Sequence, residues 1–83
     1  MRDDAITIEG PVASWINDGQ THDIFITFDG EIDTMDMLDT LSTIGGCNPT
    51  DGWPGNALVE INGDAIPALL DVDGIQAVSP NDP

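Results

Sequence analysis

The chain has 83 residues, the length of one small domain. It contains 16 Asp and Glu residues against a single Arg and no Lys, so its formal net charge is −15. This charge excludes direct contact with nucleic-acid phosphates and with anionic membrane surfaces, because almost no cation is present to replace their counterions. No apolar run is long enough to span a membrane and no apolar signal core follows the first residues, so we expect neither a membrane span nor a secretory signal.

The hydrophobic content predicts a folded chain. Hydrophobic residues make up 40% of the sequence and recur rhythmically, although high net charge and few aromatic residues are typical of disorder. We therefore expect a single domain over residues 1–83. A domain of this size buries only about 60–65% of its unfolded surface, so its stability is marginal. Repulsion among the carboxylates lowers that stability further, and salt relieves the repulsion.

The first half of the chain opens with two short apolar segments. Residues 5–9 alternate and predict a strand, and residues 12–16, entered through Gly10-Pro11, are a second strand candidate. Residues 23–28 are the clearest strand, since apolar side chains alternate regularly along them. Residues 17–22 are then expected to form a hairpin loop between the second strand and the third.

Over residues 34–44 the spacing of the apolar residues changes to that of a helix. One apolar stripe follows helical spacing: Met37, Leu38, Leu41 and Ile44. Asp33 or Thr34 is a suitable N-cap, and Gly45-Gly46 is a stop signal.

The second half is expected to hold a loop and three more strands. Residues 47–56 predict a loop because they contain two prolines and two glycines. The predicted strands are residues 57–61, 63–70 and 75–78. Asn62-Gly63 favours a tight hairpin turn, Pro67 restricts its strand to a sheet edge, and residues 79–83 predict a frayed tail. The fold class that follows is α+β: a small, mostly antiparallel sheet of five or six short strands with one helix packed on a face.

Candidate metal and cofactor sites are weak in this sequence. Asp71-x-Asp73-Gly74 resembles the opening of a calcium loop, but the third oxygen ligand before the Gly and a later Glu are both missing. A plain acidic turn is therefore the better interpretation. No glycine-rich phosphate loop and no Lys for a Schiff base is present. We predict no metal and no cofactor.

Candidate catalytic residues are equally weak. Neighbours on a strand point to opposite faces, so Thr21-His22-Asp23 is not a catalytic triad, and His22 is interpreted as a histidine at the start of a strand. Cys47 is the single cysteine, and it is interpreted as a small buried or half-buried hydrophobe. Its surroundings lack the positive charge that a reactive thiol requires. We expect no enzyme activity.

The two tryptophans have different predicted roles. Trp15 falls in a predicted strand and is expected in the core. Trp53 lies in a loop rich in glycine and proline, where it is either a lid over the core or an anchor for a partner, because tryptophan is enriched at interface hot spots.

The densest acidic stretch is here named the acidic row: Asp29, Glu31, Asp33, Asp36 and Asp39. Carboxylates two residues apart on a strand lie about 6.6 Å apart, and those three or four apart on a helix lie about 5–6 Å apart. Phosphates along one DNA strand have comparable spacing, so such a row can imitate a phosphate backbone. Asp64, Asp71 and Asp73 extend the row if the fold brings them alongside.

In size and composition the whole chain resembles the phage-encoded DNA-mimic inhibitors, among them many anti-CRISPR and anti-restriction proteins. The resemblance involves no sequence motif. It implies an inhibitor, acting in the cytoplasm of the host cell, that binds the basic surface with which a host defence complex recognises DNA. The expected partner is thus a basic nucleic-acid-binding protein or complex, with no nucleic acid or membrane involved and the oligomeric state left open.

Two other interpretations remain open. Abundant Asp without Lys is typical of halophilic proteins, although the single Arg and the ratio of 13 Asp to 3 Glu are not. Small β-rich domains also suit assembly, so a virion structural protein such as a capsid decoration or tail accessory protein is the alternative.

Overall fold

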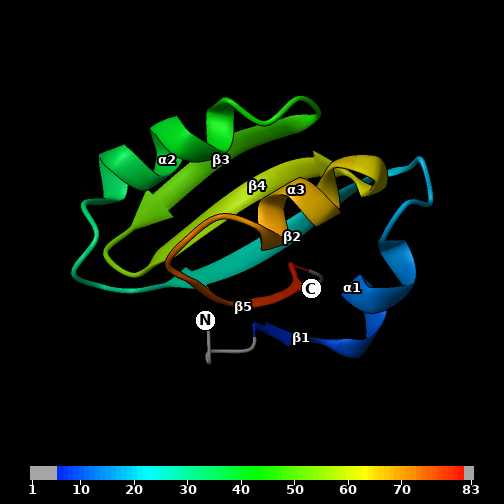
Figure 1. The fold of residues 1–83 in the computed structure, drawn as a ribbon, viewed down its shortest axis with the longest axis horizontal. Helices are drawn as coiled ribbons and strands as arrows, with labels where there is room; N and C mark the ends of the chain where they lie inside the picture. Colours follow the sequence, from blue (N-terminus) through cyan, green and yellow to red (C-terminus); the bar gives the residue numbers. More distant parts are fainter. Residues whose placement is uncertain (1–5, 82–83) are drawn as a thin grey trace.

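The computed structural model describes residues 6–81. Five strands form one sheet: β1 (Thr7–Ile8), β2 (Thr21–Phe28), β3 (Cys47–Trp53), β4 (Asn56–Asn62) and β5 (Ile75–Pro80). The helical elements are α1 (Gly10–Trp15), α2 (Thr34–Ser42), the 3-10 turn η1 (Gly63–Ala65) and α3 (Ile66–Leu70). The predicted α+β class is confirmed, with more helical segments than the single helix expected (Figure 1).

The sheet has the strand order β1-β5-β2-β4-β3. All neighbours pair antiparallel except β1 and β5, which are parallel. From β2 to β5 the element order is βαββαβ, and each crossover helix joins two parallel strands with a third strand between them. This is the ferredoxin-like, split βαβ arrangement.

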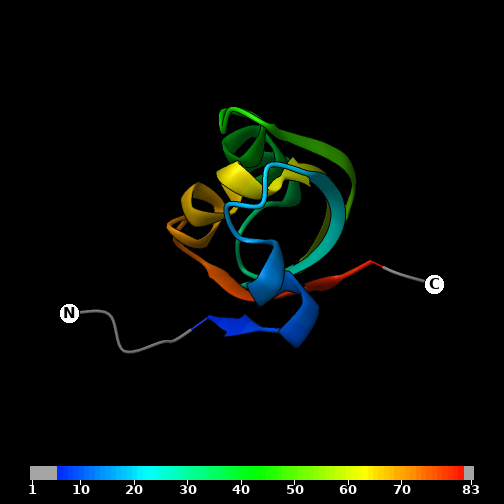
Figure 2. The same cartoon turned by 90° about the vertical axis from the view of Figure 1, so that its right-hand side faces the viewer.

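One face of this sheet carries the core. Alternate side chains of β2 and β4 are fully buried, and they pack against buried residues of the helices: Ile24, Ile26, Val59, Ile61, Leu41, Ile66 and Leu69. Figure 2 shows the sheet curving around α2 and α3, with its other face turned outward. We call this outward side the open face.

The predicted helix and the two best strands are confirmed. Residues 34–44 are helical as far as Ser42, and Asp33 is the N-cap, with its side chain accepting from the backbone N–H groups of Met35 and Asp36. The predicted strands 23–28 and 57–61 lie within β2 and β4. The N-terminal strand is observed at Thr7–Ile8 only, and Ala5 lies outside the described residues.

The predicted strand at residues 12–16 is wrong, because this segment belongs to helix α1. Pro11 occupies the first helical turn, where its fixed φ suits a helix and its missing N–H is not needed. Val12 is its single fully buried residue, too few for a helical period to be read from the sequence. Residues 17–20 therefore join a helix to β2 and do not form a hairpin loop.

The predicted loop at residues 47–56 is also wrong, since most of it is strand β3. Pro49 is tolerated because β3 is an edge strand and the register shifts just after this residue. Gly52 lies close to α2, since a Cβ there would lie 2.9 Å from Leu38 Cδ1. Gly55, with φ +83°, closes the turn to β4.

The predicted hairpin at Asn62-Gly63 and the edge strand over residues 63–70 are replaced by η1 and α3. The Asn62 side chain accepts a hydrogen bond from the Asp64 N–H and so caps a helical turn in place of a hairpin. Pro67 occupies the first turn of α3. Ile66 and Leu69, three residues apart, point together into the core.

The last strand is longer than expected. Residues 75–78 were predicted, but β5 continues to Pro80, and the Asn81 N–H donates to the Asp23 carbonyl at 3.0 Å. The expected fraying is therefore wrong for residues 79–81, while residues 82–83 lie outside the described part. Within residues 6–81 no helix has the length and apolar character needed to cross a membrane.

Candidate functional site

The acidic row starts in the loop between β2 and α2, which local hydrogen bonds hold in shape. Asp29 Oδ1 accepts from the Glu31 N–H at 2.9 Å. Asp33 Oδ1 accepts from the N–H groups of Met35 and Asp36 at 2.8 and 3.3 Å. All the carboxylates of this loop are exposed. The backbone thus fixes the direction of two carboxylates while both remain accessible to solvent.

Helix α2 carries the rest of the row. Asp36 and Asp39 are three residues apart within the helix, so their side chains lie about 5–6 Å apart, and Asp33 precedes them as the N-cap. Asp36 and Asp39 are exposed, whereas Met37 and Leu41 turn into the core. Burial of that apolar side therefore aims the carboxylates at solvent.

Of the three carboxylates that could extend the row, Asp71 and Asp73 belong to a turn beside it. The Asp29 N–H donates to the Gly74 carbonyl at 2.9 Å, which brings the turn containing Asp71 and Asp73 next to the start of the row. Asp64 follows β4, whose end pairs with the beginning of β2. Asp29 follows the other end of β2, and the seven residue steps from Thr21 to Phe28 span about 23 Å. Asp64 therefore lies at the opposite end of the sheet from Asp29.

The described residues, 6–81, contain no Lys or Arg that could balance the negative charge. The one histidine in this range is His22. None of the charged side chains in this range is buried. The carboxylates therefore repel one another across solvent, which destabilises the fold and strengthens attraction to a cationic partner.

Strand pairing places further carboxylates on the open face. Asp23 of β2 is directly opposite Glu60 of β4, and both are exposed. Asp51 of β3 is opposite Leu58 on the same face. The strand register brings Asp23, Asp51 and Glu60 together, and this register could not be read from the sequence. The carboxylates of residues 6–81 thus lie on both sides of the sheet instead of on one side only.

Trp53 lies on the open face, with 44% of its surface exposed. The expected lid over the core is therefore wrong, because the core is on the other side of the sheet. Its ring lies 6.3 Å from that of Phe25, centre to centre, at an angle of 42°. Trp15, expected in the core, is half-buried and packs against the edge of the core.

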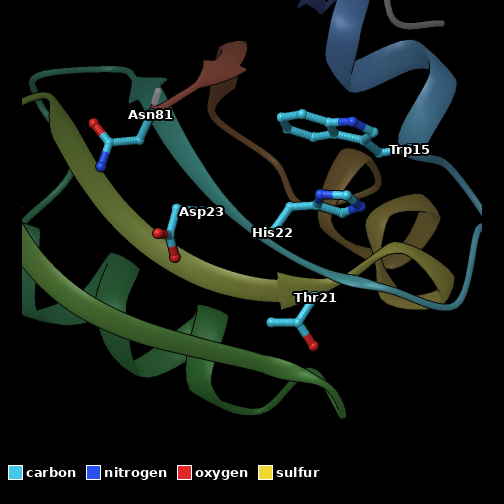
Figure 3. Close-up of a pocket in the computed structure, with 5 residues that line it drawn as sticks. All are labelled: Trp15, Thr21, His22, Asp23 and Asn81. Atoms are coloured by element: carbon cyan, nitrogen blue, oxygen red, sulfur yellow. The ribbon is translucent and has the colours of Figure 1, made fainter. Parts of the chain in front are cut away.

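A small pocket of about 270 Å³ lies where α1 meets the beginning of β2 (Figure 3). The His22 ring stacks on Trp15 with the centroids 4.1 Å apart, and its Nε2 is 2.7 Å from Asp18 Oδ2. The pKa of Asp18 is lowered, first by a hydrogen bond from the Gln20 backbone N–H and then by His22.

His22 lies near the start of a strand, as expected, but its partner Asp18 was not predicted. Figure 3 shows Thr21 pointing away from the His22 ring, as neighbours on a strand do. The Asp–His pair therefore faces no Thr21 hydroxyl that it could activate. Its observed contacts join α1 and the following loop to β2.

Cys47 is buried, as predicted, and packs in the core. Burial raises the pKa of its thiol to about 11. The thiolate is the nucleophile, so this side chain is unreactive at neutral pH. Within residues 6–81, no three His, Cys, Asp or Glu side chains come together as ligands for a metal ion.

Comparisons with known proteins find no matching family model, curated protein or solved structure. The βαββαβ arrangement does not select a function by itself, because the same fold supports many unrelated activities. The functional argument therefore depends on the side chains of the surface. Two surfaces have a distinctive chemistry: the acidic row and the open face.

Proposed function

We propose that the protein is an acidic inhibitor that mimics DNA and blocks the basic nucleic-acid-binding surface of a host defence complex. The observation that carries this proposal is the acidic row, five exposed carboxylates that continue from a loop onto one side of α2. Asp71 and Asp73 lie in the adjoining turn. The site of action is then the cytoplasm of the host cell.

The geometry of the row supports mimicry in two ways. Its carboxylate spacing of about 5–6 Å on the helix is comparable with the spacing of phosphates along a DNA strand. The backbone hydrogen bonds to Asp29 and Asp33 hold their carboxylates in place before binding. Groups that are already oriented lose less conformational entropy when a partner binds.

The charge predicts how such a complex forms. A protein with net charge −15 is steered towards a basic groove, and association is fast at low salt and slows as salt screens the field. Duplex DNA then competes for the same groove. Salt sensitivity together with DNA competition is the expected signature of the mimic.

A structural role in a virion, including one in a halophilic system, is the second candidate. The observation that favours it is the presence of carboxylates on both faces of the sheet, such as Asp36 on α2 and Asp23 on the open face. Charge spread in this way solvates a protein in concentrated salt without any partner. Capsid decoration and tail accessory proteins are the expected class.

The test measures DNA binding by a purified CRISPR surveillance complex and by a restriction endonuclease, with labelled duplex and fluorescence anisotropy. The protein is expected to displace the duplex from at least one of them. The double variant Asp36→Lys/Asp39→Lys should weaken this inhibition at least about tenfold, because opposed like charges cost several kcal/mol. The matched control is Glu9→Lys/Asp64→Lys, which changes the net charge equally at exposed positions outside the row.

The proposal is contradicted if the protein displaces the duplex from neither complex, or if both double variants lose inhibition equally. Full inhibition by Asp36→Lys/Asp39→Lys removes the α2 side of the row from the interface. Circular dichroism of each variant shows whether a loss of inhibition follows from a loss of fold.

A further inference from the structure

The open face presents an apolar strip across three strands. Phe25 of β2 is directly opposite Leu58 of β4, and Trp53 of β3 packs against Phe25. Phe25 and Leu58 are half-buried, while Trp53 is 44% exposed, the second most exposed large hydrophobic side chain among residues 6–81. Figure 2 shows that α2 and α3 lie on the other side of the sheet. The strip is therefore separate from the core that those helices cover.

Carboxylates border this strip. Asp51 is opposite Leu58, and the directly opposed pair Asp23 and Glu60 lies one step along the same face from Phe25 and Leu58. Like charges placed directly opposite on neighbouring strands destabilise a sheet. The fold therefore keeps an unfavourable pair beside Phe25 and Leu58 of the strip. A cation placed between Asp23 and Glu60 relieves this repulsion.

The same charges decide which partner fits the face. An aromatic ring on an open sheet can stack on nucleic-acid bases, but the three bordering carboxylates repel the phosphates. A second copy of the chain brings the same three carboxylates against its own. A protein surface with an apolar centre flanked by Lys or Arg is complementary to both the apolar strip and the carboxylates that border it.

The size of the open face limits the contact to a small one. Four strands about 4.8 Å apart and seven residues long cover roughly 440 Å², the bordering carboxylates included. A stable interface buries about 800 Å² on each partner. The open face alone therefore supports a weak or transient contact that uses both the strip and the carboxylates around it.

We propose that the open face docks a protein partner whose surface presents apolar side chains flanked by Lys or Arg, with Trp53 as the anchor. The apolar centre contacts Trp53, Phe25 and Leu58, and the basic side chains pair with Asp23, Asp51 and Glu60. This contact is distinct from the acidic row. It stands or fails independently of DNA mimicry.

The test uses a synthetic amphipathic helix, an 18-residue peptide of Leu and Lys at helical spacing, and a control peptide with the same Lys residues and Gln in place of Leu. Binding is followed by the anisotropy of labelled peptide in 0.3 M KCl, where purely charged contacts are screened. The Leu-containing peptide is expected to bind more tightly than its control. Trp53→Ala should weaken its binding roughly 30-fold, as loss of a hot-spot tryptophan does.

Two charge reversals of equal size locate the contact. Asp23→Lys/Glu60→Lys should abolish binding of the Leu-containing peptide, whereas Asp36→Lys/Asp39→Lys should leave it within about threefold. Asp23→Asn/Glu60→Gln is the milder variant if the first reversal does not fold, and a smaller loss of affinity is expected from it. In a Trp15→Phe background, emission from Trp53 should shift to the blue when the peptide covers the ring.

The proposal is overturned if both charge reversals weaken binding equally, or if the two peptides bind with equal affinity. It is also overturned if sedimentation equilibrium of the protein alone shows a dimer that Trp53→Ala dissociates. In that case the occupant of the open face is a second copy of the chain.

Discussion

Gly63 is the residue at which the described structure leaves least room for a side chain. It is buried, its N–H donates to the Gln20 carbonyl at 2.7 Å, and its carbonyl accepts from Asn17 at 2.9 Å. A Cβ at this position would collide with the Trp15 carbonyl and the Asp18 carboxylate. Backbone on one side and an oriented carboxylate on the other leave no flexible group that can move away.

We predict that Gly63→Ala lowers the free energy of unfolding by about 2 kcal/mol, as overpacking does. In a domain of this size the melting temperature then falls by about 10 °C. Thermal unfolding followed by circular dichroism measures the change. Gly30→Ala is the matched control, because a Cβ there meets nothing within 4 Å. Equal melting temperatures for the two variants would show that the α1–η1 junction relaxes freely.

Cys47 gives a prediction for alkaline pH. Burial raises the pKa of its thiol from 9.0 to about 11. Between these values the unfolded chain loses the thiol proton while the folded chain keeps it, so the free energy of unfolding falls as pH rises from 9 to 11. Urea titrations across that range should show the fall, and Cys47→Ala should remove it. An identical pH dependence in both proteins contradicts the raised pKa.

At the level of elements, the N-cap of α2 links local stability to the acidic row. Asp33 accepts hydrogen bonds from two backbone N–H groups that have no partner within the helix. Asp33→Ala should therefore destabilise the protein by about 1 kcal/mol, despite removing one repelling charge. Asp39→Ala, on the same helix but outside the cap, should be neutral or stabilising. Urea unfolding of both variants measures the difference. Equal changes in the free energy of unfolding would show that Asp33 does not stabilise the helix as its N-cap.

The elements that could be predicted are those long enough to show a full period. β2 alternates over eight residues and α2 combines an N-cap with a two-turn apolar stripe, so local sequence determined both. α1 and α3 have six and five residues, which is too short for a helical period, and their prolines indicate a helix start as well as a strand edge. β3 contains Pro49 and Gly52, which local sequence rules assign to a loop.

Only part of the candidate surfaces could be predicted, for a similar reason. The acidic row is continuous in sequence, so its residues were found without a structure. The Asp23–Glu60 pair and the contact between Phe25 and Trp53 depend on strand register, which is set by packing of the whole sheet. The position of Asp71 and Asp73 beside Asp29 likewise depends on where α3 returns the chain.

For the whole molecule, we predict that salt stabilises the fold. The net charge is −15, and the screening length falls from about 30 Å at 0.01 M to about 10 Å at 0.1 M salt. The melting temperature should rise with KCl mainly up to about 0.1 M, and more shallowly in Asp23→Asn/Glu60→Gln, where a repelling pair is removed. Cooperative unfolding near 0.1 M KCl with little gain above it is expected of the mimic. A chain that folds only in molar KCl indicates solvation in a halophilic system instead.

The strand order also constrains how the chain reaches its folded state. β2 occupies the middle of the sheet, yet both of its neighbours, β4 and β5, come much later in the sequence. During synthesis on the ribosome its hydrogen-bonding groups have no partner strand until β4 has emerged. Only the β3–β4 hairpin can close early. Repulsion among the carboxylates of the emerging polypeptide opposes aggregation through this unpaired, apolar strand.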